Sequence, residues 1–472
     1  MRKTKIICTL GPAADTPEML RKLIENGMDA ARFNLSHGTH EGHLETLKRL
    51  REASAALNAP IATILDTKGP EIRIGTFKCG TVNLKAGSSF VLTSRITDGD
   101  SSCVSVTFAD LPGELHEGCR ILLDDGLLEL SVDYIAGPDI HTTVLTGGPL
   151  SGNKSINIPG VCINLPSITE NDRSDLRFAA ENDFDYIAAS FVRRASDIEA
   201  IRSELIKYGG NDIPIIAKIE NREGVENMDA IIEAADGLMV ARGDLGVEMP
   251  AWDVPPIQKK MIAKCAASGK PVIIATQMLD SMIRNPRPTR AEVSDVANAV
   301  YDGASCVMLS GETASGLYPL ESLKTMVDTI TAAENSIHYW KRFTNSGIRP
   351  DGTISGAIGH SCCLTAMDLD AKAILAATTS GYTARVISRF RPSCPIIAFT
   401  QTERNRRRLA LYWGVLPCLL SQTGSTDEIF ESCVSLAKEQ GFVSPGDTVV
   451  LTAGVPVGIS GTTNLIKAQK VV

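Results

Sequence analysis

The feature that most constrains the fold is a repeat of short apolar runs, rich in β-branched residues, that alternate with longer amphipathic segments. The runs are typical of strands and begin near Thr4, Ala30, Ile61, Tyr186, Ile213, Asp236, Pro271 and Ser305. The segments between them are long enough for helices, for example Thr16 to Asn26, His40 to Leu57 and Pro255 to Ser268. Parallel strands need a crossover connection of this length, so the repeat predicts a closed (β/α)8 TIM barrel. A doubly wound open sheet is the alternative that the spacing leaves open.

One interval of the repeat, from Ile61 to Tyr186, is several times longer than the others. Between about Glu71 and Pro166 it contains short alternating runs broken by turns, such as Arg120 to Leu123 followed by Asp124-Asp125-Gly126. This texture is typical of a small antiparallel β-barrel inserted after the third strand. Because the loops at the carboxyl ends of barrel strands carry the chemistry, we expect the insert to cover the active site as a lid.

The end of the chain has a separate pattern. Phe343 to Ser355 shows no hydrophobic period and is interpreted as a linker. Beyond it, strand-like runs alternate with helical segments, which predicts a carboxyl-terminal open α/β domain; the runs are Ala373 to Thr379, Pro395 to Thr400 and Asp447 to Thr452. The expected division is a barrel in two parts (1–70 and 167–345), an inserted lid (71–166) and a carboxyl-terminal α/β domain (346–472).

Composition excludes several classes of protein. A formal net charge of −8 argues against a general nucleic-acid binder, which needs a basic face. No apolar stretch approaches the ~20 residues that span a bilayer, so no membrane partner is expected. The 12 cysteines form no CxxC pair, which indicates packed, reduced thiols and a cytoplasmic location.

Polar groups directly follow five of the predicted barrel strands. They lie in the segments Arg32 to Gly38, Asp66 to Arg73, Lys218 to Asn221, Ala241 to Asp244 and Ala275 to Met278. Any one of these segments could be a helix cap or a surface loop. The carboxyl ends of parallel barrel strands meet at one rim, so five together predict an active site there.

The residue types at this rim suit phosphoryl transfer. Glu220 and Asp244 can supply the one or two carboxylates that Mg2+ commonly takes from a protein. Gly243 permits close backbone approach at a helix N-terminus, and Arg32 and Lys218 add positive charge for phosphate oxygens. Metal, guanidinium, ammonium and amide groups together stabilise a transferring phosphoryl group. A second cluster with one carboxylate and several neutral oxygens suits a monovalent cation; its members are Asn34, Ser36, Asp66 and Thr67.

Seven strings then make the interpretation specific, because they resemble pyruvate kinases in sequence and in order. The strings are ARFNLSHG from Ala31, DTKGPEIR from Asp66, AKIEN from Ala217, MVARGDLGVE from Met239, ATQMLDSM from Ala275, NPRPTRAE from Asn285 and VMLSGETA from Val307. The resemblance spans essentially the whole chain, and the insertion falls where that family has its lid. Leu35 stands where phenylalanine is common in the family, and both are apolar.

The resemblance implies an enzyme that transfers a phosphoryl group from phosphoenolpyruvate to ADP, giving pyruvate and ATP in the final step of glycolysis. Its catalytic residues would be Arg32, Lys218 and Thr276, with Gly243 and Asp244 also at the substrate. Mg2+ would be held by Glu220 and Asp244, and K+ by Asn34, Ser36, Asp66 and Thr67. The nucleotide would face Asn34, Ser36, His37, Arg73 and, from the lid, Lys154.

The family resemblance also bears on regulation. In this family a glutamate at the position of Glu71 accompanies K+ dependence, whereas a lysine there supplies the charge itself. The loops Thr378 to Gly381 and Ser460 to Thr463 resemble the family's site for a phosphorylated effector, a sugar phosphate or a nucleotide. The implied effector residues are Thr378, Thr379, Ser380, Gly381 and Thr383, and seven arginines between Ser380 and Ala410 could contribute to an allosteric phosphate site. The alternative for these arginines is a solvated or subunit-facing helix surface. Members of the family are usually homotetramers, and Asn285 to Arg290 is a plausible subunit contact.

Two other functions compete with this one. A metal-dependent lyase or aldolase would also hold an enolate on a barrel rim, but it would need no nucleotide. A catalytically retired binding protein would keep the scaffold without the reacting groups, and the presence of Arg32, Lys218, Glu220, Asp244 and Thr276 argues against it. His37, His40 and His43 suggest a zinc site only weakly, because at most two of them share a helix face.

Overall fold

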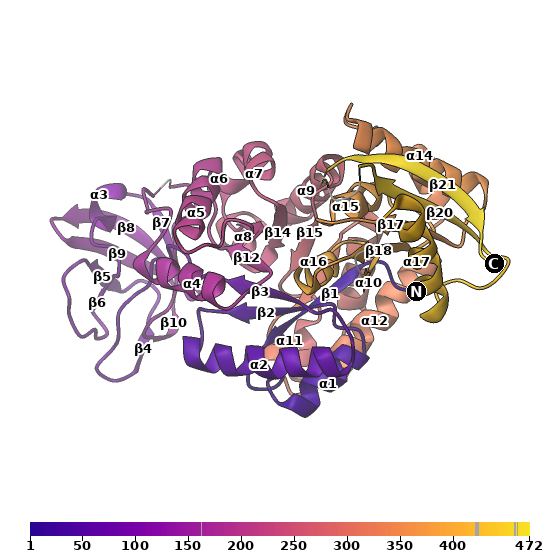
Figure 1. Cartoon of the computed structure of the whole chain (residues 1–472). Helices are drawn as coiled ribbons and strands as arrows, with labels where there is room; N and C mark the ends of the chain where they lie inside the picture. Colours follow the sequence, from indigo (N-terminus) through magenta and orange to yellow (C-terminus); the bar gives the residue numbers. More distant parts are fainter. Residues whose placement is uncertain (162, 421–423, 457–458, 460) are drawn as a thin grey trace.

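The centre of the computed structural model is a closed ring of parallel strands (Figure 1). The structure describes residues 1–161, 163–420, 424–456, 459 and 461–472. Within these residues the ring has eight strands, in the order β1 (Lys5–Leu10), β16 (Cys306–Leu309), β15 (Val272–Ala275), β14 (Gly237–Ala241), β13 (Ile215–Ile219), β12 (Tyr186–Ala189), β3 (Ala62–Asp66) and β2 (Ala30–Asn34). The predicted (β/α)8 barrel is confirmed. The open sheet is excluded, because β1 pairs in parallel with both β2 and β16 and so closes the ring.

Helices surround the barrel and are fixed by local signals in the sequence. They are α1 (Pro17–Glu25), α2 (His40–Ala56), α4 (Glu170–Glu181), α5 (Ala195–Lys207), α6 (Arg222–Glu226), α7 (Met228–Ala234), α8 (Arg242–Glu248), α9 (Val254–Ser268), α10 (Arg290–Asp302), α11 (Gly311–Ala314) and α12 (Pro319–Asn335), with short 3-10 turns at Ala251–Asp253 and Asp280–Ile283. Helix α10 shows the pattern: Thr289 and Glu292 form a capping box at its start, and Gly303 ends it in the left-handed region at φ +99°.

Each barrel strand buries both of its faces, which explains why the strands are continuous apolar runs rather than alternating ones. One face points to the helices: Ile6 and Cys8 belong to the cluster packed between strands and helices. The other face fills the barrel interior, where Ile7 and Tyr186 meet Leu411 from the carboxyl-terminal domain. The interior is therefore a packed core, and reactive groups can lie only at its rims.

The long interval between β3 and β12 forms a body of its own, as predicted, and stands out from the barrel in Figure 1. Its elements are β4 (Thr81–Leu84), β5 (Ser89–Thr93), β6 (Cys103–Ser105), α3 (Leu111–Glu114), β7 (Arg120–Leu123), β8 (Leu128–Ala136), β9 (Asp139–Thr146), β10 (Gly148–Ser151) and β11 (Ile156–Asn157). Among the described residues they make a six-stranded sheet and a two-stranded sheet around a separate apolar cluster. Asp124 and Asp125 adopt positive φ in the tight turn between β7 and β8.

The carboxyl-terminal domain is an open, mostly parallel sheet covered by helices, as the fold prediction stated. Its described elements are α13 (Tyr339–Asn345), α14 (Ile354–Asp368), β17 (Ala373–Ala377), α15 (Tyr382–Arg389), β18 (Ile396–Thr400), α16 (Glu403–Leu409), β19 (Val415–Leu419), α17 (Thr426–Glu439), β20 (Thr448–Gly454) and β21 (Thr463–Lys470). The sheet order is β19-β18-β17-β20-β21, with β21 antiparallel to β20. The predicted linker was too long at both ends: Phe343 to Asn345 belong to α13, which buries Tyr339 and Phe343, and α14 already begins at Ile354.

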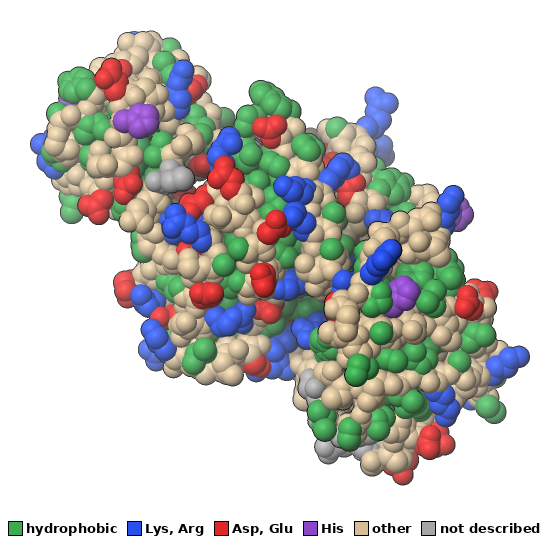
Figure 2. All heavy atoms as spheres, turned by 90° about the horizontal axis from the view of Figure 1, so that it is seen from above, with side chains coloured by type: hydrophobic (Ala, Val, Ile, Leu, Met, Phe, Trp, Pro, Cys, Tyr) green, Lys and Arg blue, Asp and Glu red, His purple; other side chains and the backbone are tan. Residues whose placement is uncertain are grey.

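Helix α16 of this domain contacts the barrel through ion pairs. Arg407 pairs with Asp183 and Asp185 before β12, and Arg404 and Arg408 pair with Asp212 before β13. These arginines face the barrel through ion pairs, which corrects the expectation of a solvated face or a phosphate site for them. On the face shown in Figure 2, basic and acidic side chains are mixed over the molecule. No helix in the described ranges is both long and apolar enough to span a membrane.

Candidate active site

Lys218 is the centre of a buried polar cluster at the carboxyl end of the barrel. It lies on β13, where its Nζ is 2.9 Å from Asp66 Oδ1, 3.0 Å from Glu220 Oε1 and 2.7 Å from Ser190 Oγ. Burial alone would lower the pKa of Lys218, but the charges of Asp66 and Glu220 outweigh it and raise the pKa. The side chain is therefore a fixed ammonium group that points out of the barrel core.

Arg32 joins the same cluster from the neighbouring part of the rim. Its Nε donates to Asp66 Oδ2 at 2.5 Å and its Nη1 donates to Thr9 Oγ1 at 3.2 Å. Asp66 is fully buried, and although burial would raise its pKa, Arg32 and Lys218 together lower it. One carboxylate thus positions two cationic groups side by side.

Glu220 and Asp244 are the two acids predicted to hold a metal, and they lie close enough to affect each other. Burial raises the pKa of Glu220 against the attraction of Lys218, and the charge of Asp244 raises it further. Burial also raises the pKa of Asp244, with contributions from Asp125 and Glu71. Each acid is thus destabilised as an anion by burial and by a nearby carboxylate, which a bound divalent cation would relieve. The donor set fits Mg2+, which commonly takes one or two protein carboxylates.

Thr276 and Gly243 meet across the rim from two different strands. Thr276 Oγ1 accepts a hydrogen bond from Gly243 N at 2.7 Å and donates to Ala275 O at 2.6 Å. Thr276 follows β15 and adopts φ +66°, a strained value for a β-branched residue that is typical of functional sites. A helix was expected to begin after Gly243, but α8 begins at Arg242, so Gly243 lies within its first turn.

The predicted monovalent-cation residues lie at the ends of the paired strands β2 and β3 and in the loops that follow them. Asn34 Oδ1 accepts from Ser36 N at 3.2 Å, and Thr67 Oγ1 accepts from Ser190 N at 3.3 Å. Asp66 lies directly before Thr67, and its two oxygens are engaged by Arg32 and Lys218. The cluster therefore offers neutral oxygens beside one carboxylate whose charge is shared with two cations.

Arg73 lies in the segment through which the chain enters the lid from β3, and Lys154 lies in the lid between β10 and β11. Ile74 N donates to Lys154 O at 2.9 Å, so the two segments pair where the lid begins. Arg73 is held by Glu71 Oε2 at 2.7–2.8 Å, and Lys154 is held by Asp124 at 2.8 Å. The side chains of Arg73 and Lys154 are both partly exposed where these two segments pair.

The three histidines near the second strand do not converge. His37 is exposed after β2, and its carbonyl oxygen lies 2.7 Å from His43 Nε2. His40 instead pairs with Asp175 on α4 at 2.6 Å. The described residues contain no group of three or more side chains arranged to hold a metal through His, Cys, Asp or Glu. The weak zinc suggestion therefore finds no support.

Sequence reasoning missed three groups that touch the cluster. Ser190 Oγ bridges Lys218 and Asp66, and Phe191 N donates to Glu220 Oε2 at 2.5 Å. Both residues follow β12, the fourth barrel strand, whose end carries no charged residue to mark it as part of a site. Thr9 at the end of β1 was missed for the same reason. Only Ser190 carried a signal, because it is a polar residue directly after a buried strand.

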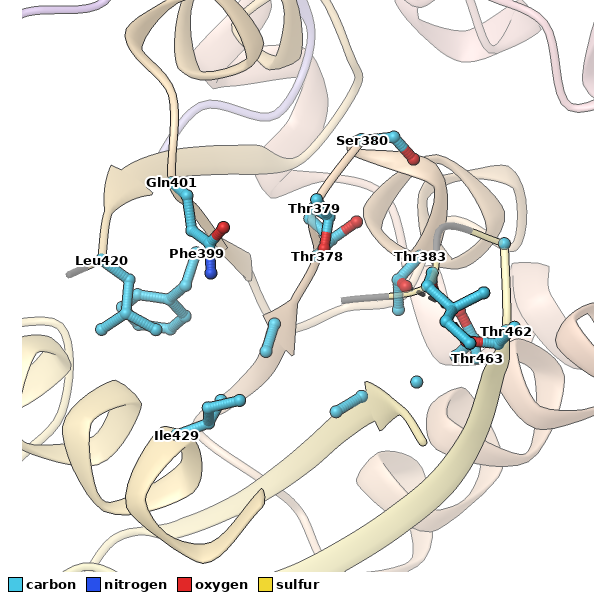
Figure 3. Close-up of a pocket in the computed structure, with 15 residues that line it drawn as sticks. Thr378, Thr379, Ser380, Thr383, Phe399, Gln401, Leu420, Ile429, Thr462 and Thr463 are labelled. Atoms are coloured by element: carbon cyan, nitrogen blue, oxygen red, sulfur yellow. Dashed lines mark hydrogen bonds between the residues drawn. The ribbon is translucent and has the colours of Figure 1, made fainter. Parts of the chain in front are cut away.

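Of the five predicted effector residues, all but Gly381 line a hollow in the carboxyl-terminal domain (Figure 3). Thr378, Thr379 and Ser380 follow β17, and Thr383 Oγ1 lies in direct contact with Thr463 Oγ1, at 2.6 Å, in the wall of the hollow. Gly381 is the N-cap residue directly before α15 and has φ +82°; an added Cβ there would come within 2.9 Å of Leu409. Ser460 lies outside the described residues. The described lining residues include no arginine.

Comparison with known proteins agrees with this architecture. The family model for the pyruvate kinase barrel domain matches residues 1–323, and the model for the pyruvate kinase alpha/beta domain matches residues 356–469. The chain is 51% identical over 471 residues to pyruvate kinase of Geobacillus stearothermophilus, covering 99% of this chain and 80% of that protein. It is 48% identical over 472 residues to pyruvate kinase of Clostridium acetobutylicum, covering both chains completely. The chain belongs to the pyruvate kinase family.

Proposed function

We propose that this enzyme transfers the phosphoryl group of phosphoenolpyruvate to ADP at the rim where β2, β3, β13, β14 and β15 end. The observation that carries the proposal is a chain of direct contacts of 2.5–3.0 Å, which runs from Arg32 through Asp66 and Lys218 to Glu220. Charge stabilisation and positioning dominate phosphoryl transfer, and this cluster supplies both in a buried setting.

Each side chain has a distinct task in the proposed reaction. Arg32 binds oxygens of the transferring phosphoryl group. Lys218 stabilises the negative charge that develops on that group and on the enolate left behind. Thr276, whose hydroxyl is oriented by Gly243 N, holds the carboxylate end of the substrate and assists protonation of the enolate. Arg73 and Lys154 contact the nucleotide from the lid side, together with Asn34, Ser36 and His37.

The acids at the rim would hold the divalent ion that this chemistry requires. Glu220 and Asp244 would coordinate Mg2+, which supplies positive charge to the phosphate oxygens when it is bound. Phe191 N and Lys218 orient Glu220 by donating to its two oxygens. Asn34, Ser36, Asp66 and Thr67 would hold K+ beside this site.

Asp244→Asn is expected to raise the Mg2+ concentration for half-maximal activity by about tenfold or more, because one of two carboxylate ligands is lost. The measurement is a Mg2+ titration of the rate at saturating substrates. Asp253→Asn, which removes an acid beyond the end of α8, is the control and should leave the titration unchanged. An unchanged Mg2+ requirement in Asp244→Asn would remove this residue from the metal site.

Glu71→Lys is expected to weaken activation by K+. Glu71 lies close enough to Asp244 to raise the pKa of that acid, so a lysine there brings an ammonium group toward the same charges. Because the substitution also breaks the pair with Arg73, the quantity to measure is the ratio of rates with and without K+, not the absolute rate. Glu71→Gln breaks the same pair without adding charge and should keep K+ activation. Equal K+ dependence in Glu71→Lys and the parent enzyme contradicts the assignment.

The hollow lined by Thr378, Thr379, Ser380 and Thr383 is the proposed site for a phosphorylated effector, either a sugar phosphate or a nucleotide. Hydroxyl groups and backbone amides at the start of α15 are suitable donors to phosphate oxygens. Thr378→Val combined with Thr383→Val should abolish activation by such an effector while leaving the basal rate unchanged.

We expect the enzyme to act in the cytoplasm as a homotetramer, and Asn285 to Arg290 is the proposed subunit contact.

One assay separates the proposed function from its rivals. Pyruvate formation from phosphoenolpyruvate is followed in a coupled reaction, with and without ADP, Mg2+ and K+. The proposal requires formation that depends on ADP and yields ATP in equal amount. A lyase would act without ADP, and a retired scaffold would show no turnover under any of these conditions.

A further inference from the structure

A second cavity lies away from the reactive rim, between the barrel and the carboxyl-terminal domain. It has a volume of about 520 Å³ and is bounded by the ends of α9 and α10, by α13, and by Phe390 and Arg391 after α15. This volume is in the range of small-molecule sites, which is roughly 300–1,000 Å³. Figure 1 shows α9, α10 and α15 close to the base of the barrel, away from the lid.

Two arginines from separate segments of the chain meet at Gly303 in the wall of this cavity. Arg391 Nη2 donates to Gly303 O at 3.1 Å and to Ser305 Oγ at 2.9 Å. Arg342 of α13 approaches the other side of Gly303, where an added Cβ would come within 2.7 Å of its Nη2. Gly303 has φ +99°, so glycine is needed both for the backbone and for the close approach of Arg342.

In the part of the chain that the structure describes, neither guanidinium group forms an ion pair with an acid. Arg391 Nη1 is buried without a hydrogen-bond partner, and the guanidinium lies 4.7 Å from the centre of the Trp413 ring. Among the residues that the structure describes, Arg342 has no ion pair and no side-chain hydrogen bond. Burial and the charge of Arg342 lower the pKa of Arg391 to about 9, which reflects the cost of placing two like charges together.

The nearby acids are already engaged elsewhere. Asp302 pairs with Lys259, and Glu334 accepts hydrogen bonds from the backbone amides of Lys3 and Thr4. Lys341 and His338 of α13 also line the cavity and can only add positive charge. Within the described residues Arg391 Nη1 is buried without a partner, and the like charge of Arg342 beside it adds to the cost of that burial. An anion between the two guanidinium groups would relieve this cost.

We propose that this cavity binds the oxyanion group of a small metabolite, either a phosphate or a carboxylate, between Arg342 and Arg391. Two planar guanidinium groups match the oxygens of such an anion, and Arg391 Nη1 gains the partner that it lacks. The remaining walls include Ile337, Ile348 and Phe343, so the rest of the ligand meets apolar side chains. This site is separate from the hollow at Thr378 to Thr383 and from the barrel rim.

The test is site-resolved modification of arginine in the full chain. Arg342 is partly exposed, so p-hydroxyphenylglyoxal can modify it and the rate can be followed by mass spectrometry of its peptide. Inorganic phosphate or succinate, added in separate arms, is expected to slow this modification several-fold and saturably. The arm that protects identifies the anion. Arg21, an exposed arginine of α1, is the internal control whose rate should stay constant.

Two variants decide whether protection arises in this cavity. Arg391→Gln should abolish the protection of Arg342, whereas Thr378→Val in the other hollow should preserve it. Protection that persists in Arg391→Gln, or disappears in Thr378→Val, means that the anion acts from elsewhere and overturns the proposal. The proposal is also overturned when neither anion changes the rate of modification of Arg342 in the parent protein. This includes the case in which a second copy of the chain already covers Arg342. That measurement needs no variant to fold.

Discussion

Lys218→Ala is expected to lower kcat at least about 100-fold, because a preorganised charge stabiliser is lost from a buried site. Lys218 Nζ contacts Asp66, Glu220 and Ser190, so its removal also leaves two carboxylates without their shared counter-charge. The pKa of Glu220, which Lys218 holds down, should then rise further and weaken metal binding. Steady-state kcat at saturating Mg2+ and substrates is the measurement, with folding verified by circular dichroism.

Lys5→Ala is the matched control for the loss of a buried lysine. Lys5 lies on β1 at the opposite end of the barrel, is 4% exposed, and donates to Val415 O at 2.7 Å. Lys5→Ala should lower the stability of the protein by about as much as Lys218→Ala does, but it should leave kcat nearly unchanged. A fall of about twofold or less in Lys218→Ala would exclude Lys218 from transition-state stabilisation.

The barrel and its rim were predictable because they follow from local patterns. Eight buried strands with helical crossovers admit few topologies, and the carboxyl ends of parallel strands must share one rim. The polar groups after β2, β3, β13, β14 and β15 could therefore be grouped by their position in the repeat alone. The pattern could not predict which of these groups are in contact. Asp66 binds both Arg32 and Lys218, and these contacts depend on how side chains pack across strands.

The residues that sequence reasoning missed share one physical cause. Ser190 and Phe191 act through a hydroxyl and a backbone amide, which leave no charged signature in a sequence. The prediction for the arginines of α16 was wrong for the opposite reason. Seven arginines between Ser380 and Ala410 suggested a phosphate ligand. The partners of the α16 arginines, Asp183, Asp185 and Asp212, are far away in the chain and belong to the barrel. Long-range charge pairing is invisible without the tertiary fold.

Arg407→Ala is expected to destabilise the protein by about 3–5 kcal/mol, because it leaves a buried acid without its counter-charge. Asp185 is 0% exposed, and both of its oxygens lie 3.1 Å from Arg407 Nε. Its remaining partners are the backbone amide and hydroxyl of Thr63, each at 2.9 Å. Denaturant unfolding followed by tryptophan fluorescence measures the change.

Arg404→Ala provides the matched control on the same helix. Among the described residues, Arg404 pairs only with Asp183 and Asp212, whose side chains are 48% and 46% exposed. Its loss should therefore cost at most about 1 kcal/mol. A comparable loss of stability in Arg404→Ala and Arg407→Ala would show that burial of Asp185 is not the cause.

The pH dependence of Arg407→Ala tests the same mechanism independently. Burial raises the pKa of Asp185 even against the attraction of Arg407, so removing that arginine must raise the pKa further. A carboxyl group with a raised pKa in the folded state destabilises that state once pH exceeds the pKa of the unfolded chain. The stability difference between Arg407→Ala and the parent should therefore shrink as pH falls from neutral toward the unfolded pKa of aspartate, about 3.9. Adding Asp185→Asn to Arg407→Ala should recover most of the loss at neutral pH, because the amide oxygen still accepts from Thr63 but carries no charge. No recovery, or a pH-independent deficit, would mean that Arg407 stabilises the domain contact by packing instead of charge.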